Sequence, residues 1–259
     1  MRKPIHTLFT ALPDCSVPAS SLWERVKDSP ITALCYDSRL ATEGTVFFCL
    51  VGKVSDGHTF ALSAYRRGCR FFVAERELDL PADAVVFTVP DTRVALADTA
   101  AEFYDHPERE MKLIGLTGTK GKTTTALLIQ NLLTAAGIPA GYVGTNGVDY
   151  ANRHFHTVNS TPESVEIYRH LRGMLDAGVK VCALEVSSQA LWMGRIRGLV
   201  FDSVLFLNLS RDHIGGVEHP DFEHYKNCKK RLFSLCKTGI FNSDDDYFPD
   251  MSRDCSGKV

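Results

Sequence analysis

Residues 115–125 read Gly-Leu-Thr-Gly-Thr-Lys-Gly-Lys-Thr-Thr-Thr, and this glycine-rich stretch decides the fold of the second half of the chain. The apolar run before it, residues 112–116, predicts a short strand. The run after it, residues 126–133, has helical apolar spacing and strong helix formers. A strand, a glycine loop and a helix in this order form the context in which a phosphate-binding loop is expected.

Each residue type in this loop has a physical role in binding phosphate. Gly118 and Gly121 permit backbone conformations that bring N–H groups toward phosphate oxygens, and the helix N-terminus adds unpaired N–H groups. Lys122 can place its charge beside the β- and γ-phosphates, and the Thr123 hydroxyl can bind Mg²⁺. Leu116 stands where the usual pattern has its first glycine, so a glycine turn without a ligand is the alternative. We predict a nucleotide site formed by Gly118, Thr119, Lys120, Gly121, Lys122, Thr123 and Thr124.

Length and composition describe a globular protein of one large or two ordinary domains. The chain has 259 residues, 44% of them hydrophobic and 23% charged. Its formal charge of −2 argues against a nucleic-acid binder with a basic face, and no run approaches the ~20 apolar residues that span a bilayer. The first thirty residues have no signal-peptide core, and the eight cysteines have no Cys-x-x-Cys spacing. We therefore expect a reduced, cytoplasmic, monomeric protein with no nucleic-acid or membrane partner.

The alternation of strands and helices indicates two α/β domains. We predict a small N-terminal domain at residues 1–108 and a P-loop domain with a doubly wound parallel sheet at residues 109–259, joined by the polar segment 105–110. Strands are expected at 45–51, 69–74, 84–89, 112–116, 140–144, 179–186, 201–207 and 239–242. Helices are expected at 21–27, 58–67, 92–104, 126–133, 163–177 and 221–235. Residues 145–160 look like a long polar loop and the last fifteen like a polar tail, so we expect a truncated chain with an unfinished sheet.

Two polar features follow apolar strands, where an open parallel sheet places its ligands. Glu185 ends an apolar run, and an acidic side chain there can hold Mg²⁺ beside a triphosphate; a solvated strand-end carboxylate is the alternative. His213 closes the segment Asn-Leu-Ser-Arg-Asp-His after the next strand, and a neutral imidazole suits a metal ligand. The histidines outside this context are expected at the surface or in loops: His154, His156, His170, His219 and His224.

The form Gly-Thr-Lys-Gly-Lys-Thr-Thr at 118–124 resembles the ATP loop of the Mur ligases, which add amino acids to the UDP-sugar precursor of the bacterial cell wall. Lys120 stands where family members usually carry Asn, a change in the exposed part of the loop. The resemblance runs from about residue 32 to 245 and includes Asp-Ser-Arg at 37–39, Gly-Thr-Val-Phe-Phe at 44–48, Asp-Gly-His at 56–58, Asn-Ser-Thr-Pro at 159–162, Glu-Val-Ser-Ser at 185–188 and Ser-Arg-Asp-His at 210–213. It implies that the UDP-sugar substrate is bound by Ser38, Asn159, Ser160, Thr161, Ser187 and Arg195.

The segment Tyr-Lys-Asn-Cys-Lys-Lys-Arg-Leu-Phe at 225–233 resembles the Mur segment whose lysine reacts with CO₂. The resemblance implies that Lys229 becomes N6-carboxylysine, that it acts with the catalytic residues Lys122 and His213, and that Mg²⁺ is held by Thr123, Glu185, His213 and Lys229. Carbamylation requires the unprotonated amine, so burial that lowers the lysine pKa favours it. From the residues alone, the simpler interpretation is an ordinary basic helix face of Lys226, Lys229, Lys230 and Arg231.

The order of these motifs is most similar to the branch of the family that adds the third amino acid, the tripeptide synthetases. The implied reaction is ATP-dependent amide formation. The γ-phosphoryl group passes to the D-Glu carboxylate of UDP-N-acetylmuramoyl-L-Ala-D-Glu, and the amino group of the added amino acid attacks the acyl phosphate. Family members have a C-terminal domain that reads this amino acid. We expect it to be missing here, so that the chain binds its substrates but ligates poorly or not at all.

Two other functions stay open. The D-Ala-D-Ala-adding ligase shares the Asp-Ser-Arg and Asp-Gly-His features, although the segments 185–188 and 211–213 argue against it. A nucleotide-binding module without catalysis is the second alternative. A GTPase is disfavoured because the sequence contains no Asn-Lys-x-Asp motif. Gln189, Met193 and Ile214-Gly215-Gly216 depart from the family pattern and leave the accepted peptide undetermined.

Overall fold

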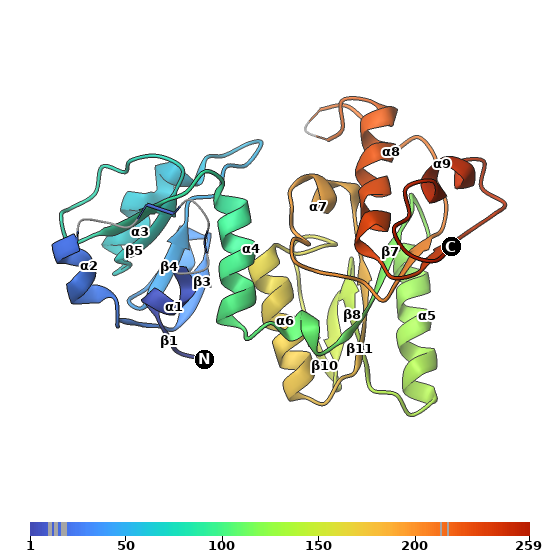
Figure 1. Cartoon of the computed structure of the whole chain (residues 1–259), viewed down its shortest axis with the longest axis horizontal. Helices are drawn as coiled ribbons and strands as arrows, with labels where there is room; N and C mark the ends of the chain where they lie inside the picture. The colour runs from blue at the N-terminus through green and yellow to red at the C-terminus, as the bar shows by residue number, and fades with distance from the viewer. Residues whose placement is uncertain (10–11, 13–14, 17–19, 213, 217) are drawn as a thin grey trace. The chain divides into compact units, whose positions relative to one another are not determined.

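The computed structural model describes residues 1–9, 12, 15–16, 20–212, 214–216 and 218–259. The chain forms two compact units, Met1–Asp105 and His106–Val259, each with its own sheet (Figure 1). The division falls inside the polar segment 105–110. The expected fold class, a small α/β unit followed by a P-loop unit on a largely parallel sheet, is confirmed. His213 lies outside the described residues, so its predicted role as a metal ligand stays a prediction.

The first unit is built on a four-stranded parallel sheet. Its strands lie in chain order: β3 (Ala33–Cys35), β4 (Thr45–Phe48), β5 (Phe71–Ala74) and β6 (Val85–Thr88). All residues of β4 and β5 are buried, which is typical of parallel strands covered on both faces. The remaining regular elements are β1 (Lys3–Pro4), α1 (Ile5–Phe9), α2 (Ser20–Val26), β2 (Pro30–Ile31), α3 (Ala61–Arg66) and α4 (Thr92–Phe103), with short 3₁₀ turns at Ser38–Leu40 and Gly57–Phe60.

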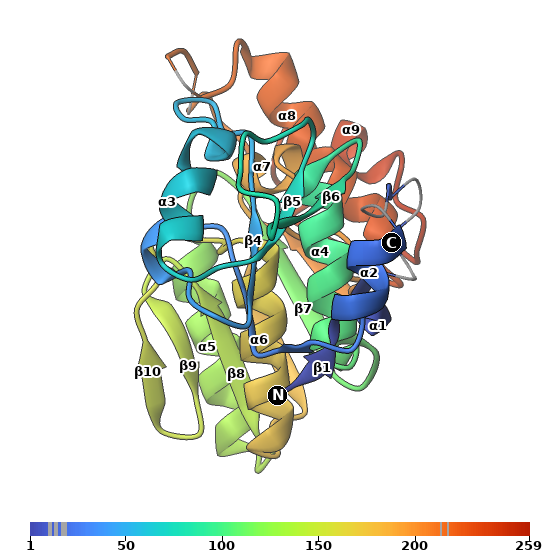
Figure 2. The ribbon, with the colours of Figure 1, turned by 90° about the vertical axis from the view of Figure 1, so that its left-hand side faces the viewer.

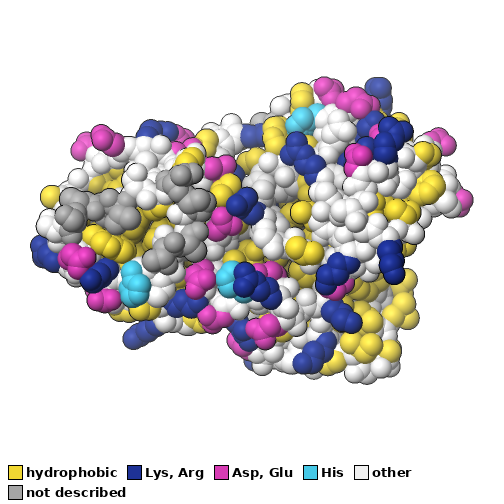
Figure 3. Space-filling model, viewed as in Figure 1, with side chains coloured by type: hydrophobic (Ala, Val, Ile, Leu, Met, Phe, Trp, Pro, Cys, Tyr) yellow, Lys and Arg dark blue, Asp and Glu magenta, His cyan; other side chains and the backbone are white. Residues whose placement is uncertain are grey.

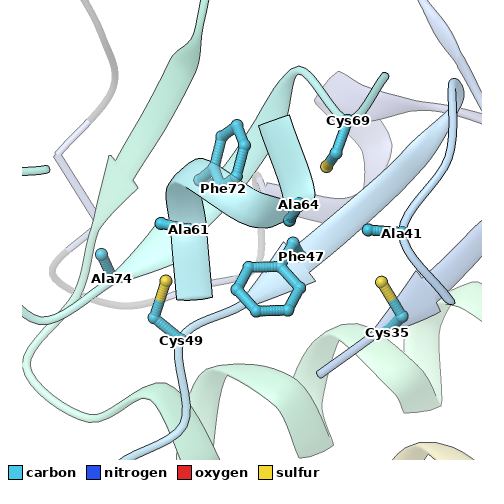
Figure 4. Close-up of a cluster of buried hydrophobic side chains, with 9 residues drawn as sticks. All are labelled: Cys35, Ala41, Phe47, Cys49, Ala61, Ala64, Cys69, Phe72 and Ala74. Atoms are coloured by element: carbon cyan, nitrogen blue, oxygen red, sulfur yellow. The ribbon is translucent and has the colours of Figure 1, made fainter. Parts of the chain in front are cut away.

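Aromatic rings and small side chains fill the core of this unit (Figure 4). The rings of Phe47 and Phe72 meet edge to face, with centroids 6.2 Å apart. Cys35 and Cys49 fill the space beside them, and burial raises the pKa of each thiol to about 12. These thiols are therefore protonated at neutral pH and pack as small apolar groups. All eight cysteines of the chain are free.

The second unit contains a seven-stranded sheet in the order β10-β9-β8-β11-β7-β12-β13. Five strands run parallel: β7 (Lys112–Thr117), β8 (Ala140–Gly144), β11 (Val181–Glu185), β12 (Ser203–Phe206) and β13 (Gly239–Phe241). Two antiparallel strands, β9 (Gly147–Tyr150) and β10 (Arg153–Phe155), extend one edge. Because β7 is the middle strand of the parallel part, its carboxyl end lies between those of β11 and β12.

Helices α5 (Lys122–Ala135) and α6 (Ser164–Asp176) cover opposite faces of this sheet, as Figures 1 and 2 show. Ala126 of α5 packs with Tyr142 and Ala183 on one face. On the other face an added Cβ at Gly141 would lie 2.7 Å from the sulfur of Met174 in α6, so glycine allows this close approach. The remaining helices are α7 (Ser188–Trp192), α8 (Phe222–Lys230) and α9 (Phe248–Ser252), with 3₁₀ turns at Pro107–Arg109 and Arg231–Leu235.

Two expectations about irregular segments were wrong. Residues 145–160 are not one long loop, because β9 and β10 form a hairpin whose turn places Ala151 and Asn152 at φ of +48° and +60°. The sequence pattern predicted a loop here because β10 lies at the sheet edge, where its polar residues are exposed. The last fifteen residues are not a simple polar tail either. They contain α9, and the backbone oxygen of Lys258 accepts from the N–H of Gly239, the first residue of β13.

The placement of one histidine was also wrong. His170 was expected at the surface or in a loop, but it lies in a helix and is only 5% exposed, whereas His219 lies in a loop, as expected, and is 2% exposed. His170 lies in α6 with its ring 5.1 Å from that of Phe155, and burial lowers its pKa to about 4. It is therefore a neutral, packed side chain at pH 7.

Acidic and basic side chains are interspersed on the face shown in Figure 3, as the small net charge implies. Within the described residues, no helix is both long enough and apolar enough to cross a membrane.

Candidate functional site

The phosphate-binding loop lies at the carboxyl end of β7 and leads directly into α5. Gly121 precedes the helix with φ of +85°, a left-handed conformation that favours glycine. At Gly118 an added Cβ would lie 3.1 Å from the Leu207 side chain and 3.2 Å from the backbone oxygen of Asn208. The backbone therefore requires both glycines, and the first N–H groups of α5 lie at the loop, where an anion can accept from them.

Asn208, which follows β12, holds this loop in place. Its side-chain amide bonds to both backbone polar atoms of Lys120, at 3.0 and 3.1 Å, and its backbone oxygen accepts from the N–H of Thr119 at 3.0 Å. The Thr119 hydroxyl donates to the backbone oxygen of Ser210 and lies 3.1 Å from the Tyr225 hydroxyl. Thr119 is thus a buried anchor of the loop, whereas Lys120 is exposed.

Two lysines converge on one oxygen of the loop. The Lys122 amine donates to the carbonyl oxygens of Gly118 at 2.8 Å and Thr119 at 3.1 Å, and burial lowers its pKa. The Lys229 amine reaches the same Gly118 oxygen from α8 at 2.9 Å and lies 4.7 Å from the centroid of the Tyr225 ring. Burial, reinforced by the charge of Lys122, lowers the pKa of Lys229 to about 7. A large share of this amine is therefore unprotonated at neutral pH.

The neighbouring basic residues of α8 behave differently. Lys226 and Lys230 both pair with Asp250, at 2.8 and 3.0 Å, and hydrogen bonds to acidic side chains raise their pKa. Lys229 is only 2% exposed. The basic stretch therefore splits into a paired surface part and one buried amine directed at the phosphate-binding loop.

Glu185, at the end of β11, is completely buried. One carboxylate oxygen accepts from the Tyr142 hydroxyl at 2.6 Å and the Thr145 N–H at 3.0 Å. The other accepts from the hydroxyls of Thr123, at 3.1 Å, and Thr145, at 3.2 Å. An added Cβ at Gly144 would clash with this carboxylate, so glycine is required there too. The carboxylate is thus fixed beside the first turn of α5, where Thr124 follows Thr123.

The segment predicted to contact the UDP-sugar is tied to the end of β11. The Thr161 hydroxyl donates to the backbone oxygen of Glu185 at 2.8 Å and accepts from the N–H of Ser187 at 3.0 Å. Arg195 pairs with Glu163 at 2.9 Å and donates to the backbone oxygen of Thr161 at 3.1 Å. The Ser160 hydroxyl lies 2.9 Å from the Thr145 hydroxyl, and Asn159 precedes Ser160 in the same loop. The structure therefore brings together Ser160, Thr161, Ser187 and Arg195 near the end of β11, with Asn159 adjacent to Ser160 in the chain.

Ser38 belongs to the first unit. It lies in a pocket of about 430 Å³ together with Tyr36, Asp37, Arg39 and Phe60. The Arg39 guanidinium pairs with Asp37 at 2.7 Å and lowers the pKa of that carboxyl.

The side chains of the motif Asp-Gly-His at 56–58 make hydrogen bonds that hold the backbone of the first unit. The Asp56 carboxylate caps the turn Gly57–Phe60 and lies 2.6 Å from Nδ1 of His58, whose other nitrogen accepts from the N–H of Glu75.

Sequence reasoning missed Tyr142, Thr145 and Tyr225. Tyr142 lies inside an apolar strand, where a tyrosine is expected to pack and not to ligate. Thr145 could have been found, because it directly follows the same strand and lies at the sheet edge that collects ligands.

A parallel sheet with a phosphate-binding loop after its first strand and a carboxylate after a neighbouring strand defines a P-loop α/β protein. A family model described as "Mur ligase middle domain" matches residues 116–258, and one described as "Mur ligase family, catalytic domain" matches residues 30–104. The chain belongs to the Mur ligase family, as the loop sequence indicated.

Two similar curated proteins are named UDP-N-acetylmuramoyl-L-alanyl-D-glutamate–2,6-diaminopimelate ligase. The protein from Geobacillus thermodenitrificans is 41% identical over 93% of this chain and 49% of its own length. The protein from Clostridium perfringens is 36% identical over 88% of this chain and 47% of its own length. The chain thus spans about half the length of the curated relatives it matches.

Solved structures show the same fold. A ligase structure of that name covers the whole of this chain and 52% of its own, with a TM-score of 0.79 and 24% identity. MurF from Acinetobacter baumannii covers 95% of this chain and 53% of its own, with a TM-score of 0.66 and 20% identity.

The Tyr142→Phe substitution should destabilise the chain by about 1–3 kcal/mol, because a buried carboxylate loses one of its hydrogen-bond donors. Urea unfolding monitored by circular dichroism measures this loss. Tyr65→Phe is the matched control, since the Tyr65 hydroxyl bonds to Asp83 at an exposed site and its removal should cost much less. Equal losses in the two variants would show that the Glu185 cluster does not depend on Tyr142.

Proposed function

We propose that this chain binds MgATP and UDP-N-acetylmuramoyl-L-Ala-D-Glu and carries these two binding functions for a ligase that adds an amino acid to the D-Glu carboxylate. The observation that carries the proposal is the convergence of Lys122, Lys229 and buried Glu185 on one phosphate-binding loop. The names of the relatives support the substrate. We place this reaction in the cytoplasm.

The loop binds the triphosphate in this proposal. The N–H groups at the start of α5 donate to the phosphate oxygens, and Lys122 releases the two loop carbonyls to pair with the β- and γ-phosphates. Thr123 and Glu185 fit Mg²⁺, because they offer a hydroxyl and a carboxylate oxygen 3.1 Å apart and Mg²⁺ prefers oxygen ligands. When bound, Mg²⁺ would neutralise phosphate charge. The carboxylate already has its position, fixed by Tyr142 and Thr145.

Lys229 is the second element of the proposed site. Its unprotonated amine can add to CO₂, forming an N–C bond and releasing one proton, which converts a buried neutral amine into an anion. That anion would supply oxygen ligands for Mg²⁺ and remove the repulsion between Lys229 and Lys122. His213, outside the described residues, would complete the ligand set.

The sugar-peptide substrate is assigned to two separate surfaces. Ser38 and its pocket in the first unit would bind the UDP end, and the loop 159–161 with Ser187 and Arg195 would bind the peptide end. The buried Arg195–Glu163 pair fixes the backbone of Thr161 and thus the shape of this loop. The D-Glu carboxylate would take the γ-phosphoryl group, and the incoming amine would then displace phosphate.

Calorimetric titration with UDP-N-acetylmuramoyl-L-Ala-D-Glu should show binding in the presence of a non-hydrolysable ATP analogue and Mg²⁺. The tripeptide form of the same substrate should bind at least about tenfold more weakly, a difference of ~1.4 kcal/mol. Preference for the tripeptide would favour the D-Ala-D-Ala-adding ligase, whose structures share the fold. Binding of the nucleotide alone would favour a module without ligase substrate.

Carbamylation of Lys229 is expected to give a carbamate signal in ¹³C nuclear magnetic resonance when the chain is supplied with ¹³C-labelled bicarbonate. The signal should fade as the pH falls below about 7, because protonation removes the reactive amine. Lys229→Ala should abolish it. Lys226→Ala, a paired lysine on the same helix, should retain it; a signal that survives in Lys229→Ala would refute the assignment.

A further inference from the structure

A cluster of side chains with nitrogen and sulfur donor atoms lies on α8 and the loop before it. It shares no residue with the magnesium ligands proposed above. Its members are His219, His224 and Cys228, whose donor atoms all lie within 4.8 Å of one another. The two Nδ1 atoms of the histidines are 2.8 Å apart, and the Cys228 sulfur lies 3.7 Å from Nδ1 of His224. None of these residues has a part in the proposed ligase chemistry.

Local structure explains why these three side chains meet. His224 and Cys228 are four residues apart on α8 and therefore share one helix face. Asp221 caps the helix by accepting from the N–H of His224 at 2.7 Å, which fixes the first turn. His219 precedes this cap and is 2% exposed, and Cys228 is 1% exposed. His224 is only half-buried, so the cluster can be reached from solvent on one side.

Neighbouring groups fix the orientation of the two rings. Nε2 of His219 lies 2.8 Å from the Ser188 hydroxyl at the start of α7. The Trp192 ring packs against both histidines, with centroids 5.4 Å from His219 and 4.6 Å from His224. Metal-binding histidines characteristically use one nitrogen for the ion and the other for a hydrogen bond that holds the ring. His219 has this arrangement, with Nδ1 left to face His224.

We propose that His219, His224 and Cys228 form a binding site for a zinc-like divalent ion, with water as the fourth ligand. One thiolate and two imidazoles are a donor set that Zn²⁺ favours over Mg²⁺. In a tetrahedral zinc site, metal–nitrogen distances of about 2.1 Å and metal–sulfur distances of about 2.3 Å place nitrogens about 3.4 Å apart and nitrogen and sulfur about 3.6 Å apart. The observed 3.7 Å between the Cys228 sulfur and Nδ1 of His224 matches the second value, whereas the two Nδ1 atoms, at 2.8 Å, would move apart by about 0.6 Å to admit the ion.

The ion would act as a clamp on the phosphate-binding loop. Through Ser188 and Trp192 it links α7 to α8, and Cys228 directly precedes Lys229, which donates to Gly118. Binding releases the Cys228 proton to solvent and replaces the contact between the two Nδ1 atoms with bonds to the metal. A filled site therefore fixes the helix turn that presents Lys229 to the loop. This role depends on the contacts of α8 and holds whether or not the chain is a ligase.

Cobalt(II) is a suitable probe, because thiolate ligation gives a charge-transfer band in the near ultraviolet. The full chain, free of nucleotide, should bind one equivalent of Co²⁺ with this band, and Zn²⁺ should displace it. Cys228→Ser should lose the band, and His224→Gln should lower the affinity at least about 100-fold, whereas Ser188→Ala should lower it about tenfold. Cys15→Ser, at a partly exposed cysteine of the first unit, should bind like the unaltered chain.

Thermal unfolding tests whether the bound ion stabilises the fold as a clamp or only binds to the three side chains. Zn²⁺ should raise the Tm of the unaltered chain and of Cys15→Ser, but not that of Cys228→Ser or His224→Gln. Circular dichroism verifies that each variant folds, and His224→Gln leaves the buried thiol in place. A charge-transfer band that is absent, or that persists in Cys228→Ser, would overturn the site. A band without any rise in Tm would overturn the clamp.

Discussion

The carboxylate of Glu185 is shut off from solvent, and the arrangement of the second unit follows from the need to satisfy it. An ionised group in such a position is costly unless several donors bond to it. Here the donors come from three segments, namely Tyr142 in β8, Thr145 after it and Thr123 in the first turn of α5. One buried charge therefore fixes the end of β11 against the helix that receives the phosphates. Removal of one donor would leave the charge unsatisfied, not merely weaken a contact.

The two lysines at Gly118 impose a second constraint. Both amines use the same carbonyl oxygen, and the charge of Lys122 contributes to the lowered pKa of Lys229. When both amines are protonated, two positive charges surround one partial negative charge, and an anion completes the arrangement. A phosphate group would relieve the repulsion from one side, and a carbamate on Lys229 would relieve it from the other. The geometry of the loop thus suits the charges of its proposed ligands.

Much of this could be predicted from the sequence, because the relevant patterns are local. The loop 118–121, the strand before it and the helix after it follow from glycine positions and apolar spacing, and Glu185 follows from its place at a strand end. The β9–β10 hairpin escaped prediction because its exposed edge carries polar residues and its turn uses Ala151 and Asn152 in left-handed conformations. The burial of Lys229 and the convergence of His219 with Cys228 depend on how α8 packs, which spacing along the chain does not determine.

The most direct test of the account is a diffraction experiment on crystals of this chain grown with a non-hydrolysable ATP analogue and Mn²⁺, which shares the oxygen ligands of Mg²⁺. The anomalous signal of manganese should lie within bonding distance of the Thr123 hydroxyl and a carboxylate oxygen of Glu185. The phosphates should lie on the N–H groups at the start of α5, with Lys122 turned from the loop carbonyls toward them. Manganese bound elsewhere, or a Glu185 carboxylate that keeps all its present partners while the nucleotide is bound, would contradict it.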